Sequence, residues 1–320
     1  MSLNRTASLI VLLLACTSWL LAGGGEYAPH PSAPQTSPFA PAAAPLNTSP
    51  LAEEWLVNWA AKEYGAPQND ICNTQNSVFL PGEKVTYILY YNWNFVWLPA
   101  GEVDFRIHDL PNQYHITVVG KTYESYEWLY SSTQRFESYL DKETLLPEMH
   151  IKDVVEGSSG YSRYDRTVFN QAKQTAVSHR GKTRDDLTAE QLDLEQCMHD
   201  VVSIVYYARN LKYSEMKVGE KIPMKILMDR ETHDVDLRYL GAEAKTKVRG
   251  FGKFRTQRFS PQLIAGDVFN EGDEMQIWVT NDRNKLPVLI ESPVSVGSVK
   301  AVLKSYSGLK YPLSALIERE

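Results

Sequence analysis

The chain has 320 residues, of which 43% are hydrophobic and 22% charged, with 18 Gly, 17 Pro and 3 Cys. This is the composition of a globular protein, and it excludes a collagen, a coiled coil, a disulfide-dense miniprotein and a multi-span membrane protein. The 33 basic and 39 acidic side chains give a net charge of −6, so no basic field attracts nucleic acid.

The first 24 residues have the pattern of an export signal. Arg5 precedes the apolar run Leu9–Ala22, and glycines follow it. As a helix this run is about 21 Å long, too short for a bilayer core of roughly 30 Å. We therefore expect cleavage near Gly24 and no transmembrane span in the mature chain. The run Leu13-Leu14-Ala15-Cys16 also resembles a bacterial lipoprotein box, with Cys16 as the lipidated residue. Both interpretations predict export, to the periplasm or to the outer membrane.

Two segments separate the signal from the main domain. Residues 25–50 hold seven of the 17 prolines, which favours a disordered, extended tether. Residues 51–71 form a predicted helix and arm, in which Leu51, Trp55 and Trp59 share one helical face. This stripe predicts packing on the main domain, and a membrane or partner surface is the alternative.

From residue 72 to residue 316 the pattern is that of a single β-rich domain, because hydrophobicity alternates with a period of two between turn signals. The predicted strands are 84–93, 101–107, 114–120, 134–141, 148–156, 161–169, 221–229, 234–240, 253–259, 275–280, 287–292 and 298–306. About a dozen strands at this spacing predict an all-β, mainly antiparallel fold.

One segment breaks the strand pattern. Residues 188–211 carry two capping boxes and have apolar residues on several sides, so we expect one long, enclosed helix. A helix packed in or across a strongly curved sheet, a half-barrel or barrel, explains this pattern. Arg209 would be buried on that helix and would need a carboxylate partner, because an unpaired buried charge is costly. The candidate partners are Glu137, Asp153 and Glu156.

The cysteines and reactive residues give few indications of chemistry. Cys72 and Cys197 remain after removal of the signal, and an oxidising compartment allows them to pair; two buried thiols are the alternative. The sequence contains no H-E-x-x-H, C-x-x-C, G-x-S-x-G or phosphate-loop motif, so we predict no metal, cofactor or catalytic nucleophile. Strand carboxylates would form a glycosidase site only if two of them faced each other across a cleft.

Aromatic side chains offer the candidate ligand contacts. Rings with polar tips suit either a core or a cavity for an amphipathic ligand. The candidates are Tyr87, Tyr91, Trp93, Trp97 and Trp278.

The run FLPGEKVTYILYYNWNFVWLPAGEVDF, residues 79–105, resembles the opening of the bacterial envelope family catalogued as domain of unknown function 3108. DVVSIVYYARNL (200–211) and MQIWVTNDRNKLPVLIESPVSVGSVKAVL (275–303) continue the resemblance, which covers residues 72–313. It implies an exported protein of a Bacteroidetes-type bacterium, with a curved antiparallel sheet related to the half-barrels of lipoprotein and lipid carriers. It assigns no catalytic residues.

These features favour a non-enzymatic envelope protein that shelters a hydrophobic or amphipathic ligand, such as a lipid or an acylated partner. One alternative is a structural or scaffold module that binds another envelope protein or a glycan through an aromatic surface. A less favoured alternative is a glycan hydrolase, which requires that Glu102, Glu137, Asp153 and Glu156 converge. A concave face filled completely by side chains would count against the first hypothesis.

Overall fold

A computed structural model describes residues 72, 74–93, 96–127, 131–157, 160–262, 274–294 and 297–320. The signal, the tether, the N-terminal helix and Cys16 lie outside these residues, so the expectations for them stay predictions. No helix in the described ranges is long and apolar enough to cross a membrane.

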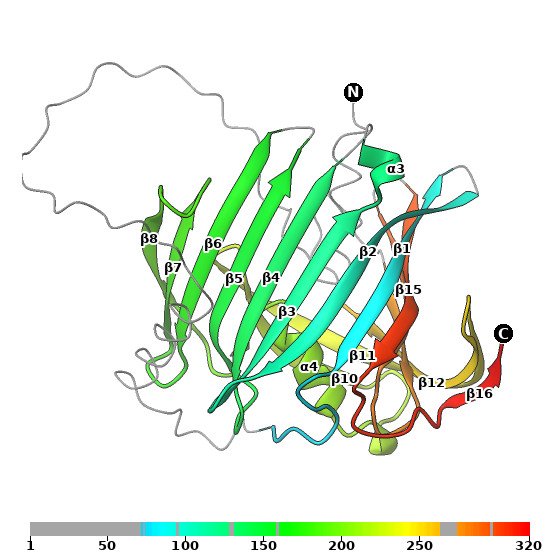
Figure 1. Cartoon of the computed structure of the whole chain (residues 1–320). Coiled ribbons are helices and arrows are strands. Elements are labelled where there is room, and N and C mark those ends of the chain that lie inside the picture. Colours follow the sequence, from blue (N-terminus) through cyan, green and yellow to red (C-terminus); the bar gives the residue numbers. More distant parts are fainter. Residues whose placement is uncertain are drawn as a thin grey trace, which may run out of the picture.

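The described strands form a single 16-stranded sheet (Figure 1). The strands are β1 (Lys84–Trp93), β2 (Val96–Asp109), β3 (Gln113–Thr122), β4 (Ser132–Asp141), β5 (Pro147–Glu156), β6 (Tyr161–Asn170), β7 (Thr175–Gly181), β8 (Thr188–Asp193), β9 (Met198–His199), β10 (Lys221–Met228), β11 (Glu231–Val248), β12 (Gly252–Pro261), β13 (Gln276–Thr280), β14 (Pro287–Pro293), β15 (Ser298–Ser307) and β16 (Leu316–Arg319). The described helices are α3 (Glu124–Glu127), α4 (Ser203–Asn210) and the 3-10 helix η2 (Tyr213–Glu215).

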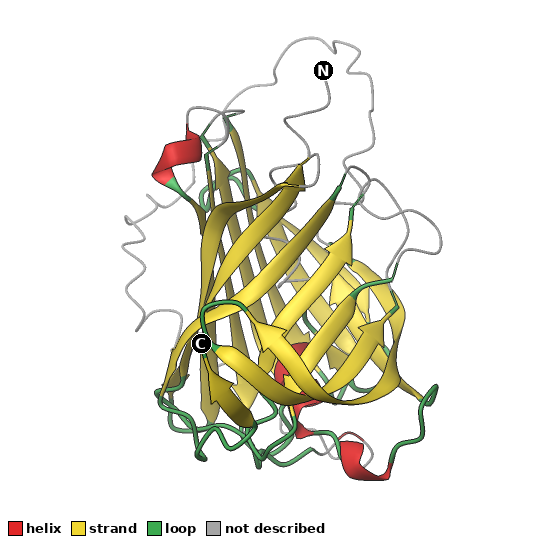
Figure 2. Ribbon diagram, turned by 90° about the vertical axis from the view of Figure 1, so that its right-hand side faces the viewer, coloured by secondary structure: helices red, strands yellow, loops and turns green. Residues whose placement is uncertain are grey.

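The sheet runs in the order β8-β7-β6-β5-β4-β3-β2-β1-β15-β14-β13-β12-β11-β10-β9, and β16 pairs with β12. The paired strands are antiparallel, except that β9 and β10 are parallel. The sheet curves strongly and encloses α4 on its concave side, as Figure 2 shows. The predicted fold class, a curved, mainly antiparallel sheet with a helix packed in it, is therefore confirmed.

The length of the helix was predicted wrongly. Residues 188–193 form β8 and pair with β7, and the helix begins only at Ser203. Its start is set by Asp200, whose carboxylate accepts hydrogen bonds from the backbone N–H of Val202 (2.7 Å) and of Ser203 (2.8 Å). Thr188 and Gln191 look like a capping box, but cross-strand pairing with β7 outweighs that local signal.

A disulfide joins Cys72 to Cys197, with a Cα–Cα distance of 5.3 Å, as predicted. The two cysteines are 125 residues apart in sequence. In the chain-entropy model, closing a loop of this length stabilises the fold by about 4–5 kcal/mol. The bond fixes the start of the described chain beside the segment that leads into α4.

Candidate ligand cavity beside helix α4

An apolar cavity of about 110 Å³ lies between α4 and strands β10 to β14. Its walls are almost entirely hydrocarbon because both α4 and the strands turn their apolar faces inward. The lining residues are Ile204, Val205, Ala208, Arg209, Tyr213, Met224, Ile226, Val235, Leu237, Phe259, Pro261, Gln262, Ile277, Val279 and Pro287.

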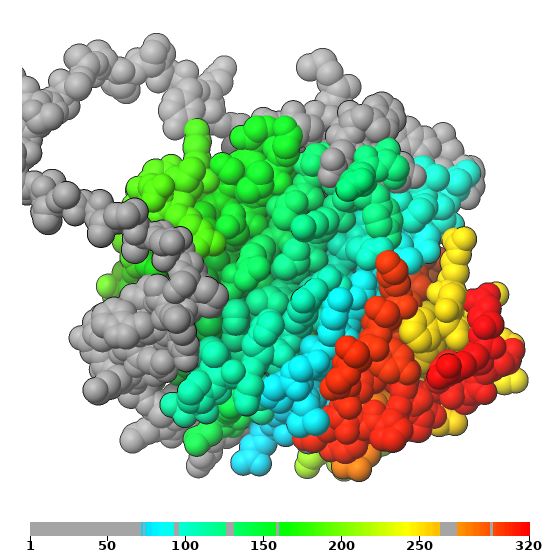
Figure 3. Space-filling model, in the orientation of Figure 1, coloured from blue at the N-terminus to red at the C-terminus, as the bar shows by residue number. Residues whose placement is uncertain are grey.

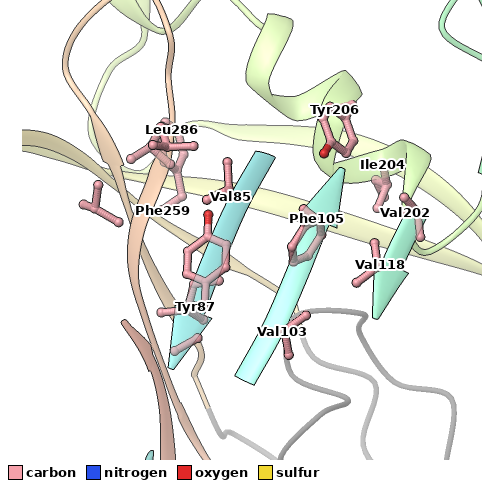
Figure 4. Packing of buried hydrophobic residues seen from close by; sticks show 14 of the residues in the cluster. Val85, Tyr87, Val103, Phe105, Val118, Val202, Ile204, Tyr206, Phe259 and Leu286 are labelled. Atoms are coloured by element: carbon pink, nitrogen blue, oxygen red, sulfur yellow. The ribbon is translucent and has the colours of Figure 1, made fainter. Parts of the chain in front are cut away.

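A second apolar cavity of about 80 Å³ adjoins the first on the side of β1 and β2. The two cavities share Val205, Arg209, Ile277 and Pro287 as lining residues. Figure 4 shows Tyr87 and Phe105 pointing from these strands toward α4. Small-molecule sites commonly measure about 300–1,000 Å³. The curved sheet is therefore largely filled by its own side chains, and the remaining space suits a short apolar group.

Arg209 is the charged residue on the walls of both cavities. Its guanidinium donates to the carboxylate of Glu83 at 2.5 and 3.1 Å and to the backbone oxygen of Asn284 at 3.1 Å. Burial alone would lower the pKa of Arg209, but the carboxylate of Glu83 raises it. Arg209 is 4% exposed, and its Nε–H has no hydrogen-bond partner among the described residues. This N–H is a buried donor on a residue that lines the apolar cavity.

The prediction that Arg209 pairs with Glu137, Asp153 or Glu156 was wrong, because Glu83 is the partner. Glu83 directly precedes β1 and is itself 1% exposed. The three predicted partners all lie on strands, whereas Glu83 lies in the turn before β1. The signal that could have found it is a carboxylate at the entrance to the most apolar predicted strand.

The turn between β13 and β14 supplies the backbone carbonyl of Asn284, which is the second acceptor for Arg209. Asp282 accepts from the backbone N–H of Asn284 (3.0 Å) and of Ala315 (3.1 Å). The side chain of Asn284 exchanges hydrogen bonds with the backbone of Tyr311, each 3.0 Å long. These side chains form the turn and attach the C-terminal segment, so the carbonyl that faces Arg209 is firmly placed.

The five aromatic candidates do not gather at one site. Tyr87 lines the smaller cavity, and its hydroxyl donates to the backbone oxygen of Pro287 (2.9 Å). Tyr91 and Trp97 are half-buried, and the Lys300 ammonium lies 4.4 Å from the Trp97 ring centroid. The side chain of Trp93 lies outside the described part of the chain.

Trp278 points away from the cavity, because its neighbours Ile277 and Val279 on β13 line the wall and side chains alternate along a strand. Its indole N–H donates to Glu243 (3.0 Å) in the distal half of β11. The end of the β11–β12 hairpin reaches β15, where the rings of Phe251 and Tyr306 stack with their centroids 5.9 Å apart. Figure 3 shows this hairpin and β16 at the right-hand edge of the outer surface.

The four strand carboxylates do not converge into a hydrolytic site. Glu102, on β2, accepts hydrogen bonds from Tyr123 and Lys304. Burial opposes ionisation of Glu137, yet hydrogen bonds from His115 and Arg135 lower its pKa to about 2. A carboxyl with this pKa is ionised at neutral pH and cannot serve as a general acid.

The other two carboxylates lie on β5. Asp153 pairs with Arg184 (3.3 Å), and Glu156 lies on the opposite face of the sheet because only two residues separate it from Asp153 and side chains alternate along a strand. The described residues also contain no group of three or more His, Cys, Asp or Glu side chains that could hold a metal ion.

Charged side chains fill the other half of the interior, and no sequence pattern indicates that they converge. The β10–β11 turn places Asp229 against Lys152 of β5 (3.1 Å) and Arg163 of β6 (2.6 Å). Arg230, the next residue, donates to the Glu190 carboxylate on β8 (2.6 Å). Asp229 and Arg230 have φ values of 52° and 75°, as a tight two-residue hairpin requires. The turn thus joins the two ends of the curved sheet through side chains.

A family model described as protein of unknown function DUF3108 matches residues 86–304. The chain belongs to the DUF3108 family. This confirms the family that the sequence resemblance suggested. No curated protein matches the chain.

Solved structures show the fold of this family member. A β-barrel-like protein of domain of unknown function DUF1849 from Brucella abortus is 12% identical, covers 73% of this chain and 100% of its own, and has a TM-score of 0.50. A protein with a YmcC-like fold from Bacteroides fragilis, described provisionally as exported, is 11% identical over 72% of this chain and 97% of its own (TM-score 0.28). A protein from Parabacteroides distasonis, described provisionally as a lipoprotein, is 10% identical. The match covers 73% of this chain and 100% of that protein, with a TM-score of 0.29. At 12% identity, the likeness to the Brucella abortus structure concerns the fold alone.

Proposed function

We propose that this DUF3108 protein is an exported, non-enzymatic binder of an amphipathic ligand in the cell envelope. The apolar end of the ligand enters the cavity beside α4, and an oxygen at its polar end accepts a hydrogen bond from Nε of Arg209. Export to the periplasm or the outer membrane follows from the signal pattern in residues 1–24.

The observation that carries this proposal is an apolar cavity bordered by a buried, unused donor. A buried donor without an acceptor costs about 1–3 kcal/mol, and a ligand oxygen in this position would remove that cost. The limited volume favours the end of an acyl chain over a whole lipid. A saturated C8 carboxylate combines a short apolar chain with an acceptor oxygen and is therefore a suitable probe.

Calorimetric titration of the mature protein with octanoate tests the proposal. Ala208 lines the cavity, so Ala208→Leu fills it and is expected to weaken octanoate binding at least tenfold. Ala189→Leu adds the same side chain at an exposed position on β8 and is expected to bind like the wild type. Native mass spectrometry of protein purified gently from the source envelope would identify any bound ligand. Equal binding by both variants, or no binding by the wild type together with an adduct-free mass, would contradict the proposal.

A scaffold function is the second candidate, and the tip of the β1–β2 hairpin favours it. Val96 and Leu98 are 57% and 36% exposed there, next to Trp97. A photo-crosslinking residue at Val96 is expected to capture an envelope partner in cells if this tip is an interface. The matched control is Val155, 52% exposed on β5. Equal labelling from both positions would exclude a specific interface at the hairpin.

A further inference from the structure

The outer face of β4, β5 and β6 carries an apolar cluster that water does not reach. Tyr139, Met149, Ile151 and Tyr164 are each 0–4% exposed, and we call them the outer cluster. They point away from the concave side, because Phe136 on β4 belongs to the interior core and Tyr139 lies three residues further along the strand. In Figure 1 these three strands lie side by side in the face of the sheet turned toward the viewer, and α4 lies on the far side of the sheet.

The described neighbours of the outer cluster include the ring of His115, which stacks on that of Tyr139 with centroids 4.2 Å apart. Leu110, Val168 and Leu187 pack against it and are only partly buried themselves. The guanidinium of Arg184 lies 4.8 Å from the centroid of the Tyr164 ring. A fully buried side chain typically touches six to twelve residues, so burial as complete as that of Ile151 requires an additional apolar layer.

We propose that residues 51–65 form this layer, as an amphipathic helix docked on the outer cluster. The disulfide holds Cys72, where the described chain begins, next to Cys197. The side-chain amide of Gln171 then links the neighbouring Met198 to the start of β5, donating to the backbone oxygens of Met198 (2.8 Å) and Pro147 (3.2 Å). Pro147 is two residues from the outer cluster, so the chain that precedes Cys72 starts beside it.

Length and chemistry also fit this occupant. Six residues, 66–71, separate the predicted helix from Cys72 and can span up to about 20 Å. Fifteen helical residues are about 22 Å long, and a helix is about 10 Å wide with its side chains, which matches three strands spaced about 4.8 Å apart. Leu51, Trp55 and Trp59 provide one apolar stripe for the tyrosines, Met149 and Ile151 to contact.

A double-mutant cycle in the mature, full-length chain tests the docking. Urea unfolding is measured for Trp59→Ala and Ile151→Ala, alone and combined. Ile116→Ala is the matched control, because Ile116 is equally buried but lies in the interior core. If the helix covers the outer cluster, Ile151→Ala changes the unfolding equilibrium constant at least fivefold less in the Trp59→Ala background than in the wild type. The effect of Ile116→Ala is expected to be the same in both backgrounds.

Two results would overturn the proposal. Additive effects for both pairs would show that Trp59 and Ile151 do not share a contact. Co-sedimentation with phosphatidylethanolamine–phosphatidylglycerol vesicles that Trp59→Ala abolishes, together with additivity, would assign the stripe to a membrane surface. A folded Trp59→Ala variant can be verified by the circular dichroism of its sheet, so loss of the whole fold cannot be mistaken for uncoupling.

Discussion

The two halves of the interior are filled by different chemistry, although one continuous sheet surrounds both. On the side of β10 to β14, hydrocarbon walls leave about 110 Å³ beside α4. On the side of β5 to β8, charged side chains meet across the interior and leave about 20 Å³. Ion pairs and hydrogen bonds fix both distance and direction, whereas apolar contacts are non-directional. The charged half is therefore suited to holding the curved sheet closed. In the apolar half, contacts between side chains can be replaced by contacts with a ligand.

The largest effect is expected where a charge reaches into the apolar half. Glu83→Gln leaves the guanidinium of Arg209 buried without a carboxylate, which costs about 3–5 kcal/mol of unfolding free energy. Urea unfolding of the variant and the wild type at pH 7 measures this loss of unfolding free energy. Glu318→Gln is the control, because the Lys253–Glu318 pair is exposed and its loss is expected to destabilise the protein far less. Similar costs for the two variants would show that burial does not set the importance of the Arg209 pair.

A smaller loss is expected at the closure of the charged half. Asp229→Asn keeps a residue that tolerates positive φ but removes the charge facing Lys152 and Arg163, at a cost of about 2–3 kcal/mol. Asp234→Asn, in an exposed pair with Lys225, is the control. Octanoate binding by Asp229→Asn is expected to stay within twofold of the wild type. A much larger loss of binding would mean that the two halves are coupled and not separate.

Sequence patterns predicted the sheet well because each strand carries its own alternation. All twelve predicted strands are present, and several of the turns between them begin at Gly, Asn or Asp, as at Asp141, Asn170 and Asn281. Strands with a polar pattern were missed. The β8 sequence TAEQLD has no apolar alternation and is a strand only because β7 pairs with it. Such a strand is fixed by its neighbour, and its own sequence does not predict it.

The site was harder to predict because it depends on register and on long-range contacts. Tyr87, one of the aromatic candidates, lines the smaller cavity, but most of the other wall residues come from α4 and from residues 275–290, far along the chain. The partner of Arg209 lies 126 residues away in sequence, in a turn. Trp278 is buried, but it lies on the face of β13 opposite the cavity, and a shift of one residue in strand register decides that orientation.

Lys152, which pairs with Asp229 in the charged half of the interior, is expected to make the stability of the protein depend on pH. Burial lowers the pKa of this ammonium to about 8, against the opposing effect of Asp229. The unfolded chain therefore binds more protons than the folded chain between pH 8 and about 10.5, so stability attributable to Lys152 rises with pH in that window. We expect Lys152→Met to gain most over the wild type at pH 8 and about 1–2 kcal/mol less at pH 10. Urea unfolding at both pH values measures this difference, and a constant gap would show that Lys152 does not titrate there.

The smallest change in stability is expected from filling the apolar cavity itself. Ala208→Leu places new methyl groups in existing space beside α4, so the unfolding free energy is expected to stay within about 1 kcal/mol of the wild type. The same substitution at Ala176 in the other half meets Phe169, Leu194 and Met198 in a closed cluster, where overpacking costs about 1–3 kcal/mol. Thermal and urea unfolding of the two variants compare the halves directly with one chemical change. If Ala208→Leu destabilises the protein as much as Ala176→Leu does, the space beside α4 cannot accept even a side chain, and a ligand could enter only by moving the helix.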